Sequence, residues 1–191
     1  LEKAGHIEKV SEIEDDVFLQ PTVITVKRDK TVKIALDARA MNEVVKKDKY
    51  QLPNLDDLTC SLAETITNEN SGEIWFSTVD LKYAYGQVPL NVELAKQCNF
   101  AIIGGKASGI YRFLTGFYGL TVMPPEFQRI MEEILANQQN VFIFLDDILI
   151  VTKGSKEDHE KKLREGLTIL DRIKLHLKPD KCQFADRKSV V

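Results

Sequence analysis

The chain has 191 residues, of which 43% are hydrophobic and 29% are charged, and its formal net charge is −3. These values are typical of a soluble globular chain with its own core, and they exclude a collagen, a coiled coil and a disordered tail. The longest apolar stretch, residues 141–151, is interrupted by two aspartates and is much shorter than the ~20 residues of a membrane-spanning helix, so we expect no membrane segment. The overall charge shows no basic excess. Residues 27–49 nevertheless carry eight Lys or Arg against four Asp or Glu, which is compatible with a local phosphate-binding face.

The cysteines bear on the redox environment of the chain, and the first residue bears on whether the chain is part of a longer protein. Cys60, Cys98 and Cys182 lie far apart, form no C-x-x-C pair and are odd in number. This pattern favours reduced intracellular thiols over a disulfide framework or a zinc site. The chain begins at Leu1 without a basic and then apolar leader, so we expect a piece of a longer protein.

The first half of the sequence predicts a hairpin, a helix and a strand. Residues 23–27 and 31–36 form a predicted β-hairpin with basic residues at its tip, the best candidate for contacting phosphate. Asn54 is a predicted N-cap for a helix with apolar residues at positions 55, 58, 62 and 66. A strand at 74–79 ends at Asp80, a second strand is predicted at 84–90, and a short helix follows from Asn91.

The second half predicts a similar mixture. Strands at 99–103 and 110–114 flank a glycine-rich turn, and Pro124-Pro125 opens a helix with an apolar face. Residues 141–145 and 148–151 are predicted strands buried on both faces. Ser155 to Asp158 resembles a capping box, and the helix after it is expected to run until Pro179. Hairpins mixed with helices predict an α+β fold, an antiparallel sheet covered by helices.

Three aspartates at strand ends need a chemical explanation. Asp146 and Asp147 separate two apolar runs, where mutual repulsion and burial penalise both charges. Asn-Gly or Asp-Gly suits the turn of a two-residue hairpin better than Asp-Asp does. The alternative explanation of Asp146 and Asp147 is a solvent-facing turn that happens to be acidic. Asp80 also ends an apolar strand. If the three meet, they can hold the pair of hard divalent cations that supports phosphoryl or nucleotidyl transfer.

Six segments occur in a fixed order along the chain. They are LDARAMN at 36–42, KYQLP with DDL at 49–58, FSTVDL with Tyr85 at 76–85, GLT with Pro124, Phe127 and Gln128 at 119–128, FLDD at 144–147 and LKPDKC at 177–182. Together they resemble the reverse transcriptase domain of retroelement polyproteins, nearest to gypsy-type long-terminal-repeat retrotransposons, over residues 1–187. Phe117 stands where the family commonly has proline.

The resemblance implies roles for individual residues. Asp80, Asp146 and Asp147, with the carbonyl of Leu81, would bind two Mg²⁺ ions or Mn²⁺, Asp147 less directly than Asp146. Lys181, or Lys178 in its place, would donate a proton to pyrophosphate. Tyr85 would be the steric gate that rejects a 2′-hydroxyl. The remaining substrate contacts implied are Lys33 with Lys27 or Arg28 on the triphosphate, Ala84 near the 3′-hydroxyl, and Asp37, Tyr118 and Gly119.

The resemblance also implies a right-hand polymerase architecture. Fingers would span about 1–56 and 88–123, and the palm about 57–87 and 124–191 with an antiparallel sheet backed by helices, while thumb, connection and RNase H are absent. The implied activity is RNA-directed DNA polymerisation, adding dNTPs to a primer on an RNA or DNA template. A polyprotein with protease and integrase, in a cytoplasmic retroelement particle, is the expected setting. The alternatives are a silent relic that only binds nucleic acid or a partner, and a palm-fold phosphotransferase such as a nucleotide cyclase.

Overall fold

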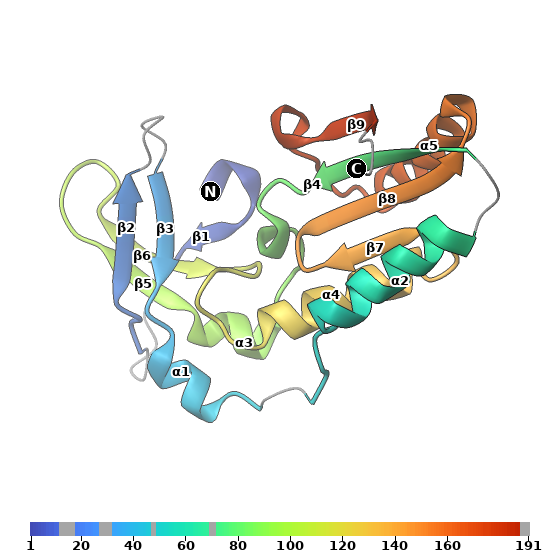
Figure 1. The fold of residues 1–191 in the computed structure, drawn as a ribbon. Coiled ribbons are helices and arrows are strands. Elements are labelled where there is room, and N and C mark those ends of the chain that lie inside the picture. The colour runs from blue at the N-terminus through green and yellow to red at the C-terminus, as the bar shows by residue number, and fades with distance from the viewer. Residues whose placement is uncertain (12–17, 27–31, 47–48, 69–71, 188–191) are drawn as a thin grey trace. The chain divides into compact units, whose positions relative to one another are not determined.

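The structure is a computed structural model that describes residues 1–11, 18–26, 32–46, 49–68 and 72–187 (Figure 1). The chain divides into a first unit, residues 1–48 and 85–124, and a second unit, residues 49–84 and 125–191. Within the described residues, all pairings between the named strands are antiparallel. The predicted α+β class is therefore confirmed.

The first unit contains two small sheets, one with the order β1-β6-β5 and one formed by β2 and β3. Three aromatic rings, Phe100, Phe113 and Phe117, are fully buried, and the successive ring centroids lie 5.2 and 4.8 Å apart. The predicted hairpins at 23–36 and 99–114 are both present, although the tip of the first lies outside the described residues. The elements are η1 (Glu2–Ala4), β1 (Ile7–Lys9), β2 (Thr22–Val26), β3 (Val32–Leu36), α1 (Arg39–Val44), α3 (Val92–Gln97), β5 (Asn99–Ile102) and β6 (Gly109–Phe113).

The strand predicted at 84–90 is wrong. The structure has a 3₁₀ turn there, η2 (Ala84–Gln87), after Tyr83 with φ of 52°. The Val88 amide donates to the Tyr85 carbonyl, which closes the turn, and the backbone pairs in an extended way only at Pro89, opposite Thr115. The short helix expected from Asn91 is confirmed as α3, with the Asn91 side chain accepting from the Leu94 amide.

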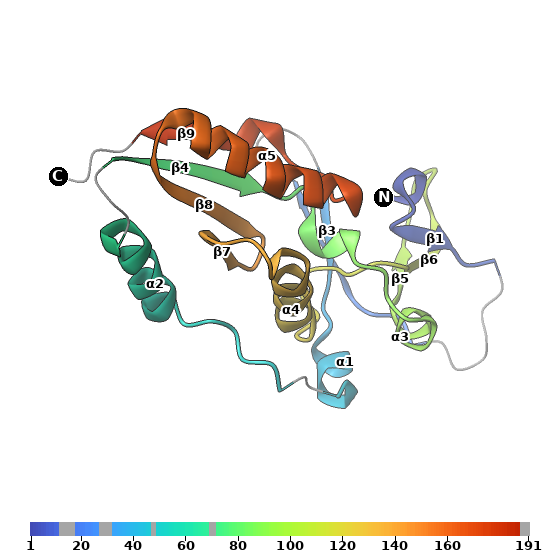
Figure 2. The same cartoon turned by 90° about the vertical axis from the view of Figure 1, so that its right-hand side faces the viewer.

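The second unit is a four-stranded sheet with the order β7-β8-β4-β9 and helices on both faces. Figure 2 shows α5 on one side of the strands and α2 on the other. Side chains alternate along β8: Ile150 and Thr152 contact α5, whereas Leu149 faces the leucines of α2. The elements are α2 (Leu55–Asn68), β4 (Glu73–Asp80), α4 (Met123–Leu135), β7 (Val141–Phe144), β8 (Asp147–Gly154), α5 (Lys156–Arg172), η3 (Pro179–Lys181) and β9 (Gln183–Arg187).

Both predicted N-caps of the second unit are confirmed. The Asn54 side chain accepts from the Asp56 amide at 3.1 Å, at the start of α2. The Ser155 hydroxyl accepts from the Asp158 amide at 3.1 Å, which is the first bond of a capping box. The Asp158 carboxylate accepts from the Ser155 hydroxyl at 2.6 Å. These short-range patterns locate both helix starts because each cap satisfies an amide that the helix leaves without an internal partner.

The end of α5 differs from the prediction. The helix stops at Arg172 and does not reach Pro179, because Lys174 adopts a left-handed backbone with φ of 62°. The Leu175 amide then donates to the Leu170 carbonyl, and the Lys174 amide donates to the Asp171 carbonyl, which is the bonding of a Schellman motif. After the helix, residues 173–178 turn back toward the end of β4, where the Lys178 amide donates to the Asp80 carbonyl.

His159 connects α5 to the sheet through a buried polar network. Its Nε2 lies 2.7 Å from the Ser77 hydroxyl on β4, and its Nδ1 lies 2.8 Å from the Thr152 hydroxyl on β8. The Ser77 oxygen also accepts from the Ala185 amide on β9. Burial lowers the pKa of His159, which favours the neutral ring, and both ring nitrogens have a hydroxyl partner.

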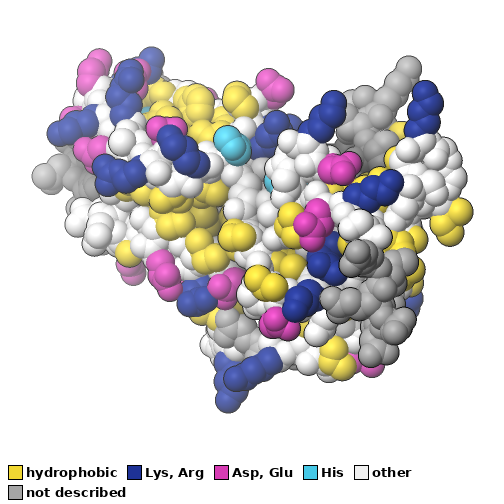
Figure 3. All heavy atoms as spheres, turned by 180° about the vertical axis from the view of Figure 1, so that it is seen from behind, with side chains coloured by type: hydrophobic (Ala, Val, Ile, Leu, Met, Phe, Trp, Pro, Cys, Tyr) yellow, Lys and Arg dark blue, Asp and Glu magenta, His cyan; other side chains and the backbone are white. Residues whose placement is uncertain are grey.

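The surface charges, the helix lengths and the cysteines complete the description of the fold. On the face shown in Figure 3, Lys and Arg side chains are interspersed with Asp and Glu side chains. In the part of the chain that the structure describes, no helix is both long and apolar enough to cross a membrane. Cys60, Cys98 and Cys182 are free thiols in this structure.

Candidate functional site

Asp80 and Asp147 lie directly opposite each other at one end of the second unit's sheet. Asp80 is the last residue of β4, and Asp147 is the first residue of β8 and its partner in the antiparallel register. Side chains that are directly opposite across two strands point to the same face of the sheet. Both aspartates accordingly line one cavity of about 500 Å³, together with Thr78 and Lys181.

Asp146 occupies the turn between β7 and β8. Phe144 and Asp147 close this turn as a pair, so its two central residues are Leu145 and Asp146, not Asp146 and Asp147. The strand predicted to run through Leu145 therefore ends one residue earlier. Leu145 has φ of 56°, as the first central residue of a type II′ turn requires. A leucine in this left-handed region costs on the order of 1–3 kcal/mol, which the surrounding contacts must offset.

The charges of the three aspartates interact. Partial burial raises the pKa of Asp147 above its ordinary value, and the charges of Asp146 and Asp80 raise that pKa further. Lys181 acts in the opposite direction on the pKa of Asp147, and its Nζ lies 3.7 Å from the Asp80 carboxylate. The end of the sheet thus carries an excess of negative charge that one lysine offsets only in part.

The segment before β9 is fixed to the end of β4 by backbone bonds. The Lys178 amide donates to the Asp80 carbonyl, and the Lys82 amide donates to the His176 carbonyl. These two bonds flank Leu81, which is 3% exposed, and neither uses the Leu81 carbonyl. The Cys182 thiol accepts from the Asp80 amide at 3.4 Å. Of the two candidate proton donors, Lys181 is the one whose side chain forms an ion pair with the Asp80 carboxylate.

The donor chemistry of this cluster fits a divalent metal ion, but the side chains are not gathered around one. Among the described residues, no group of three or more His, Cys, Asp or Glu side chains is arranged to hold a metal. Asp146 lies in the turn and is not among the residues that line the cavity shared by Asp80 and Asp147. Like charges without a cation between them favour separation. Carboxylate oxygens are nevertheless the ligands that Mg²⁺ prefers, and the raised pKa of Asp147 marks a place where a cation would be favourable.

Replacing Asp147 with asparagine is expected to stabilise the metal-free fold at neutral pH. The folded-state pKa of Asp147 is raised, so its stabilising contribution is present at acid pH and is lost as the pH rises through that pKa. Because most of the Asp147 side chain is exposed despite the partial burial of its carboxylate, solvent screens the charge, and we expect a rise in Tm of no more than about 2–4 °C. Thermal unfolding at pH 7 and pH 4 checks this, since the gain should be smaller at pH 4, close to the pKa of an unfolded aspartate. Asp180→Asn, in the same cavity, is the matched control, and a lower Tm for Asp147→Asn at pH 7 would contradict the reasoning.

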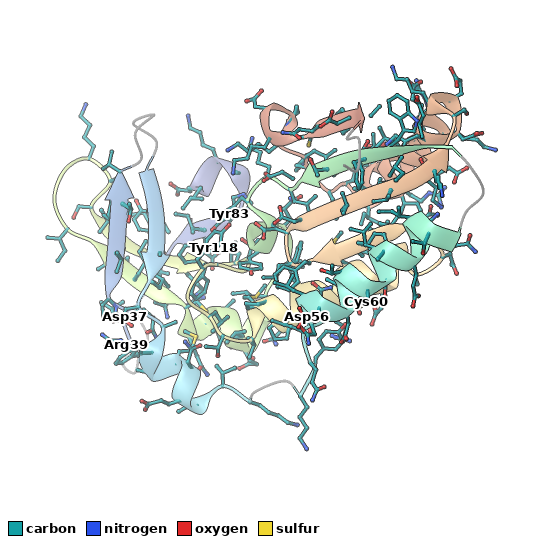
Figure 4. All side chains as sticks on the ribbon, viewed as in Figure 1. Asp37, Arg39, Asp56, Cys60, Tyr83 and Tyr118 are labelled. Atoms are coloured by element: carbon teal, nitrogen blue, oxygen red, sulfur yellow. The ribbon has the colours of Figure 1, made fainter. Side chains whose placement is uncertain are left out.

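In the first unit, the Asp37 carboxylate is already engaged. Asp37 follows β3 and Arg39 begins α1, and Figure 4 shows the two side chains together at this junction. The Arg39 guanidinium donates to both Asp37 oxygens, with Nε 2.8 Å from Oδ1. This hydrogen bonding holds the pKa of Asp37 below its usual range. The structure therefore gives Asp37 a partner within the protein at the start of α1.

Gly119 and Tyr118 belong to a loop that α1 holds in place. The Asn42 side chain donates to the Gly119 carbonyl at 2.8 Å and accepts from the Thr121 amide at 2.9 Å. A Cβ on Gly119, whose φ is 111°, would lie 2.7 Å from the Leu36 carbonyl, so only glycine fits. The Tyr118 ring packs against Tyr85 with centroids 5.1 Å apart.

For the remaining residues predicted to contact the substrate, the structure gives burial, a backbone pairing or no description. Tyr85 is 8% exposed and Ala84 is 1% exposed, both in η2. The Lys33 backbone pairs with Thr25 in the β2-β3 hairpin. Lys27 and Arg28 lie outside the described residues.

Two polar residues, one in each unit, support predicted site residues but received no role from the sequence. Asn42 lies in the 36–42 motif and holds the Gly119 loop. Gln128 is fully buried on α4, and its side chain bonds the turn that carries Asp146. The available signal for Gln128 was its spacing, because it lies three positions before Met131 and seven before Leu135 on the helix's buried face. A polar residue on such a face needs a partner.

The chain matches a protein family and several curated proteins. The family described as "Reverse transcriptase (RNA-dependent DNA polymerase)" matches over residues 26–190. An uncharacterized protein of Caenorhabditis elegans is 31% identical over 170 residues, which cover 87% of this chain and 12% of that protein. The Retrovirus-related Pol polyprotein from transposon 297 of Drosophila melanogaster is 29% identical over 159 residues, covering 82% and 14%. The Transposon Tf2-3 polyprotein of Schizosaccharomyces pombe is 28% identical over 170 residues, covering 86% and 12%. The chain thus spans 12% to 14% of the length of these relatives.

Solved structures share the fold. The foamy viral protease-reverse transcriptase in complex with double-stranded DNA superposes with a TM-score of 0.78 at 18% identity, over 99% of this chain and 30% of that one. The same viral protein in complex with an RNA/DNA hybrid gives a TM-score of 0.75 at 19% identity, over 95% and 22%. At this identity the likeness shows a reverse transcriptase fold, and the family match over residues 26–190 adds the sequence relationship. The chain belongs to the reverse transcriptase (RNA-dependent DNA polymerase) family.

Proposed function

We propose that the chain is the fingers and palm of an RNA-directed DNA polymerase from a gypsy-type long-terminal-repeat retrotransposon. The fingers would span about residues 1–56 and 88–123, close to the first unit, and the palm about 57–87 and 124–191, close to the second unit. The observation that carries the proposal is the register that places Asp80 opposite Asp147, with Asp146 in the adjoining turn and Lys181 beside Asp80. The polyprotein relatives support a longer parent protein, for which we propose a thumb, RNase H, protease and integrase and a cytoplasmic particle.

The carboxylates of the palm would perform the nucleotidyl transfer. Asp80, Asp146 and Asp147, with the Leu81 carbonyl, would hold two divalent ions, Mg²⁺ or Mn²⁺, once the carboxylates turn toward one another. When bound, such ions supply charge neutralisation for the attacking and leaving oxygens of an in-line displacement. The two strands fix the backbone of Asp80 and Asp147, so positioning is largely built into the sheet. Lys181 would give its proton to the departing pyrophosphate.

The fingers would bind the incoming dNTP. Lys33, with Lys27 or Arg28, would contact the triphosphate, and Tyr85, supported by Tyr118, would lie against the sugar. Ala84, Asp37 and Gly119 would complete the nucleotide contacts. The Asp37 carboxylate would be held in place for its contact by the hydrogen bonds from Arg39. Base pairing with an RNA or DNA template would choose the nucleotide, while the protein would contact the backbone of the primer and template.

Primer extension tests this function directly. The protein is incubated with poly(rA)·oligo(dT), dTTP and Mg²⁺, and the same assay is repeated with a polypeptide that continues beyond Val191. Mg²⁺-dependent synthesis that stops on chelation is the expected result. Binding of the primer-template without synthesis by both polypeptides would instead indicate a nucleic-acid-binding relic. Nucleotide turnover without primer would indicate a palm-fold phosphotransferase such as a cyclase.

Lys181→Met is expected to lower kcat for primer extension by about 10²-fold, the contribution typical of general acid catalysis. The reason is that Lys181 lies 3.7 Å from the Asp80 carboxylate and can supply a proton at the reacting phosphates. The measurement is the pH-rate profile of single-nucleotide addition, in which the variant should lose the limb that reports the acid. Lys178→Met is the matched control, because the structure fixes Lys178 through its backbone amide. Equal losses at both positions would contradict a specific role for Lys181.

A further inference from the structure

Gln128 is a fully buried polar residue whose hydrogen bonds converge on one turn. Its Oε1 accepts from the Leu145 amide at 2.6 Å, and its Nε2 donates to the Ile143 carbonyl at 3.0 Å. The orientation of the side-chain amide is fixed, because a backbone N–H can only donate and a carbonyl can only accept. One side chain from α4 thus holds β7 and the turn after it at two backbone positions.

The turn that Gln128 holds is the one that needs support. Leu145 is the residue with a left-handed backbone, and Asp146 and Asp147 follow it directly. A leucine adopts this conformation only when its surroundings require it. The bond from the Leu145 amide to Gln128 Oε1 is a contact that ties this strained residue to a helix. Without it, the amide would lose its partner and the turn could relax to an ordinary backbone conformation.

Gln128 is itself anchored from the other side. Its Nε2 also donates to Glu132 Oε1 at 2.7 Å, one helical turn later on α4. The second oxygen of Glu132 accepts from the Tyr50 hydroxyl. The pKa of Tyr50 is raised to about 12, by burial first and then by the bond to Glu132, so the hydroxyl stays protonated and remains a donor. The chain of bonds therefore runs from Tyr50, ahead of α2, through α4 to the turn.

We propose that Gln128 is a positioning residue for catalysis, which locks the Leu145–Asp146 turn so that Asp146 and Asp147 are presented opposite Asp80. This inference rests on the proposed polymerase function. An apolar side chain would fill the same space on α4, and burying an amide is unfavourable unless its groups are bonded. Two of the three bonds of Gln128 go to the backbone next to the paired aspartates, and the third goes to its anchor. A residue needed only for packing would not require this arrangement.

The test compares Gln128→Met with Gln138→Met. Gln138 lies just after α4, and its side-chain oxygen accepts from Lys162, so the control makes the same chemical change away from the turn. Primer extension is measured against Mg²⁺ concentration, well below the Tm of each variant. We expect Gln128→Met to lower kcat or raise the half-saturating Mg²⁺ concentration by about 10- to 100-fold, the usual effect of losing a partner behind metal-binding carboxylates. Primer-template affinity, measured by fluorescence anisotropy, should change less than twofold.

A second-site variant separates positioning from general stability. Leu145→Gly in the Gln128→Met background should recover at least part of the lost kcat, because glycine adopts the left-handed backbone without strain. Tyr50→Phe, which removes only the anchor, should give a smaller loss in the same direction and serves if Gln128→Met does not fold. Amide hydrogen exchange at Leu145 should be accelerated in Gln128→Met and unchanged in Gln138→Met.

The outcomes distinguish this inference from the proposed function. If the wild-type protein extends primers and Gln128→Met matches it in kcat and Mg²⁺ dependence, the positioning role is overturned and the polymerase function stands. A loss of kcat that Leu145→Gly does not relieve, with unchanged exchange at Leu145, also overturns it. If neither the 191-residue chain nor the polypeptide that continues beyond Val191 extends primers, the polymerase function fails, and the catalytic role of Gln128 fails with it.

Discussion

Asparagine in place of Asp80 or Asp146 is expected to abolish primer extension, with a loss of at least about 10³-fold in kcat. Asparagine keeps the shape of aspartate but removes the charge, and the loss of a metal-binding carboxylate removes several kcal/mol of transition-state stabilisation. Asp147→Asn should be tolerated better if Asp147 contributes less directly to metal binding. The register sets Asp147 opposite Asp80, so a larger loss in Asp147→Asn than in Asp146→Asn would contradict this order and would assign the shared metal ligand to Asp147.

The measurement is single-turnover addition of one nucleotide, with thermal unfolding of each variant recorded alongside. Folding should be preserved, since Asp80 and Asp146 lie at the end of the sheet and asparagine keeps the shape of aspartate. Asp80→Asn also removes the ion pair with Lys181, which is partly exposed and therefore contributes little to stability. Asp180→Asn is the matched control, because Asp180 lines the same cavity as Asp80 and is expected to retain activity. Full activity of the Asp80 and Asp146 variants would end the assignment of these residues as metal ligands. An equal loss in Asp180→Asn would point to the overall charge of the cavity.

Local sequence patterns predicted where most elements begin. The Asn54 and Ser155 caps, the two hairpins and the helix at Pro124-Pro125 were all found from spacing and turn chemistry. The three misplaced boundaries share one cause. Tyr83, Leu145 and Lys174 have positive φ, where sequence rules expect glycine or asparagine. At Leu145 the bond to Gln128 on α4 supports this conformation, whereas at Lys174 the supporting bonds are the local ones of the Schellman motif. Because none of the three residues is glycine or asparagine, the 3₁₀ turn, the position of the Asp146 turn and the early end of α5 were not predicted from the sequence.

The site was predictable in composition but not in geometry. The sequence indicated that Asp80 ends one apolar strand and that Asp146 and Asp147 separate two others, but it did not show that these strands are neighbours, which the pairing of β4 with β8 establishes. Which member of the pair faces Asp80 depends on the register, because a shift of one residue moves every side chain to the other face. The bond from Gln128 to the Leu145 amide depends on how α4 packs against β7, which no pattern in either segment encodes.

The second large effect is expected at Tyr85, and it concerns the choice of sugar. The Tyr85 side chain is 8% exposed and its ring is supported by Tyr118, with centroids 5.1 Å apart and an interplanar angle of 57°. A ring held on one side cannot move away from an added 2′-hydroxyl, so the proposed gate would act by steric exclusion. Tyr85→Ala removes that obstacle and should lower the preference for dNTP over rNTP by about 10²-fold.

The measurement for Tyr85 is the ratio of kcat/KM for a dNTP to that for the matching rNTP in single-nucleotide addition. Replacing a buried aromatic residue with alanine costs about 3–5 kcal/mol of stability, which would reduce the active fraction of the variant. Because both substrates are assayed with the same preparation, that fraction cancels in the ratio. Tyr85→Phe is the matched control and should keep the wild-type preference, since it retains the ring. Tyr118→Ala should relax the preference less than Tyr85→Ala, because it removes the support and leaves the gate. A ratio unchanged in Tyr85→Ala would show that sugar selection resides elsewhere, whatever the variant's overall rate.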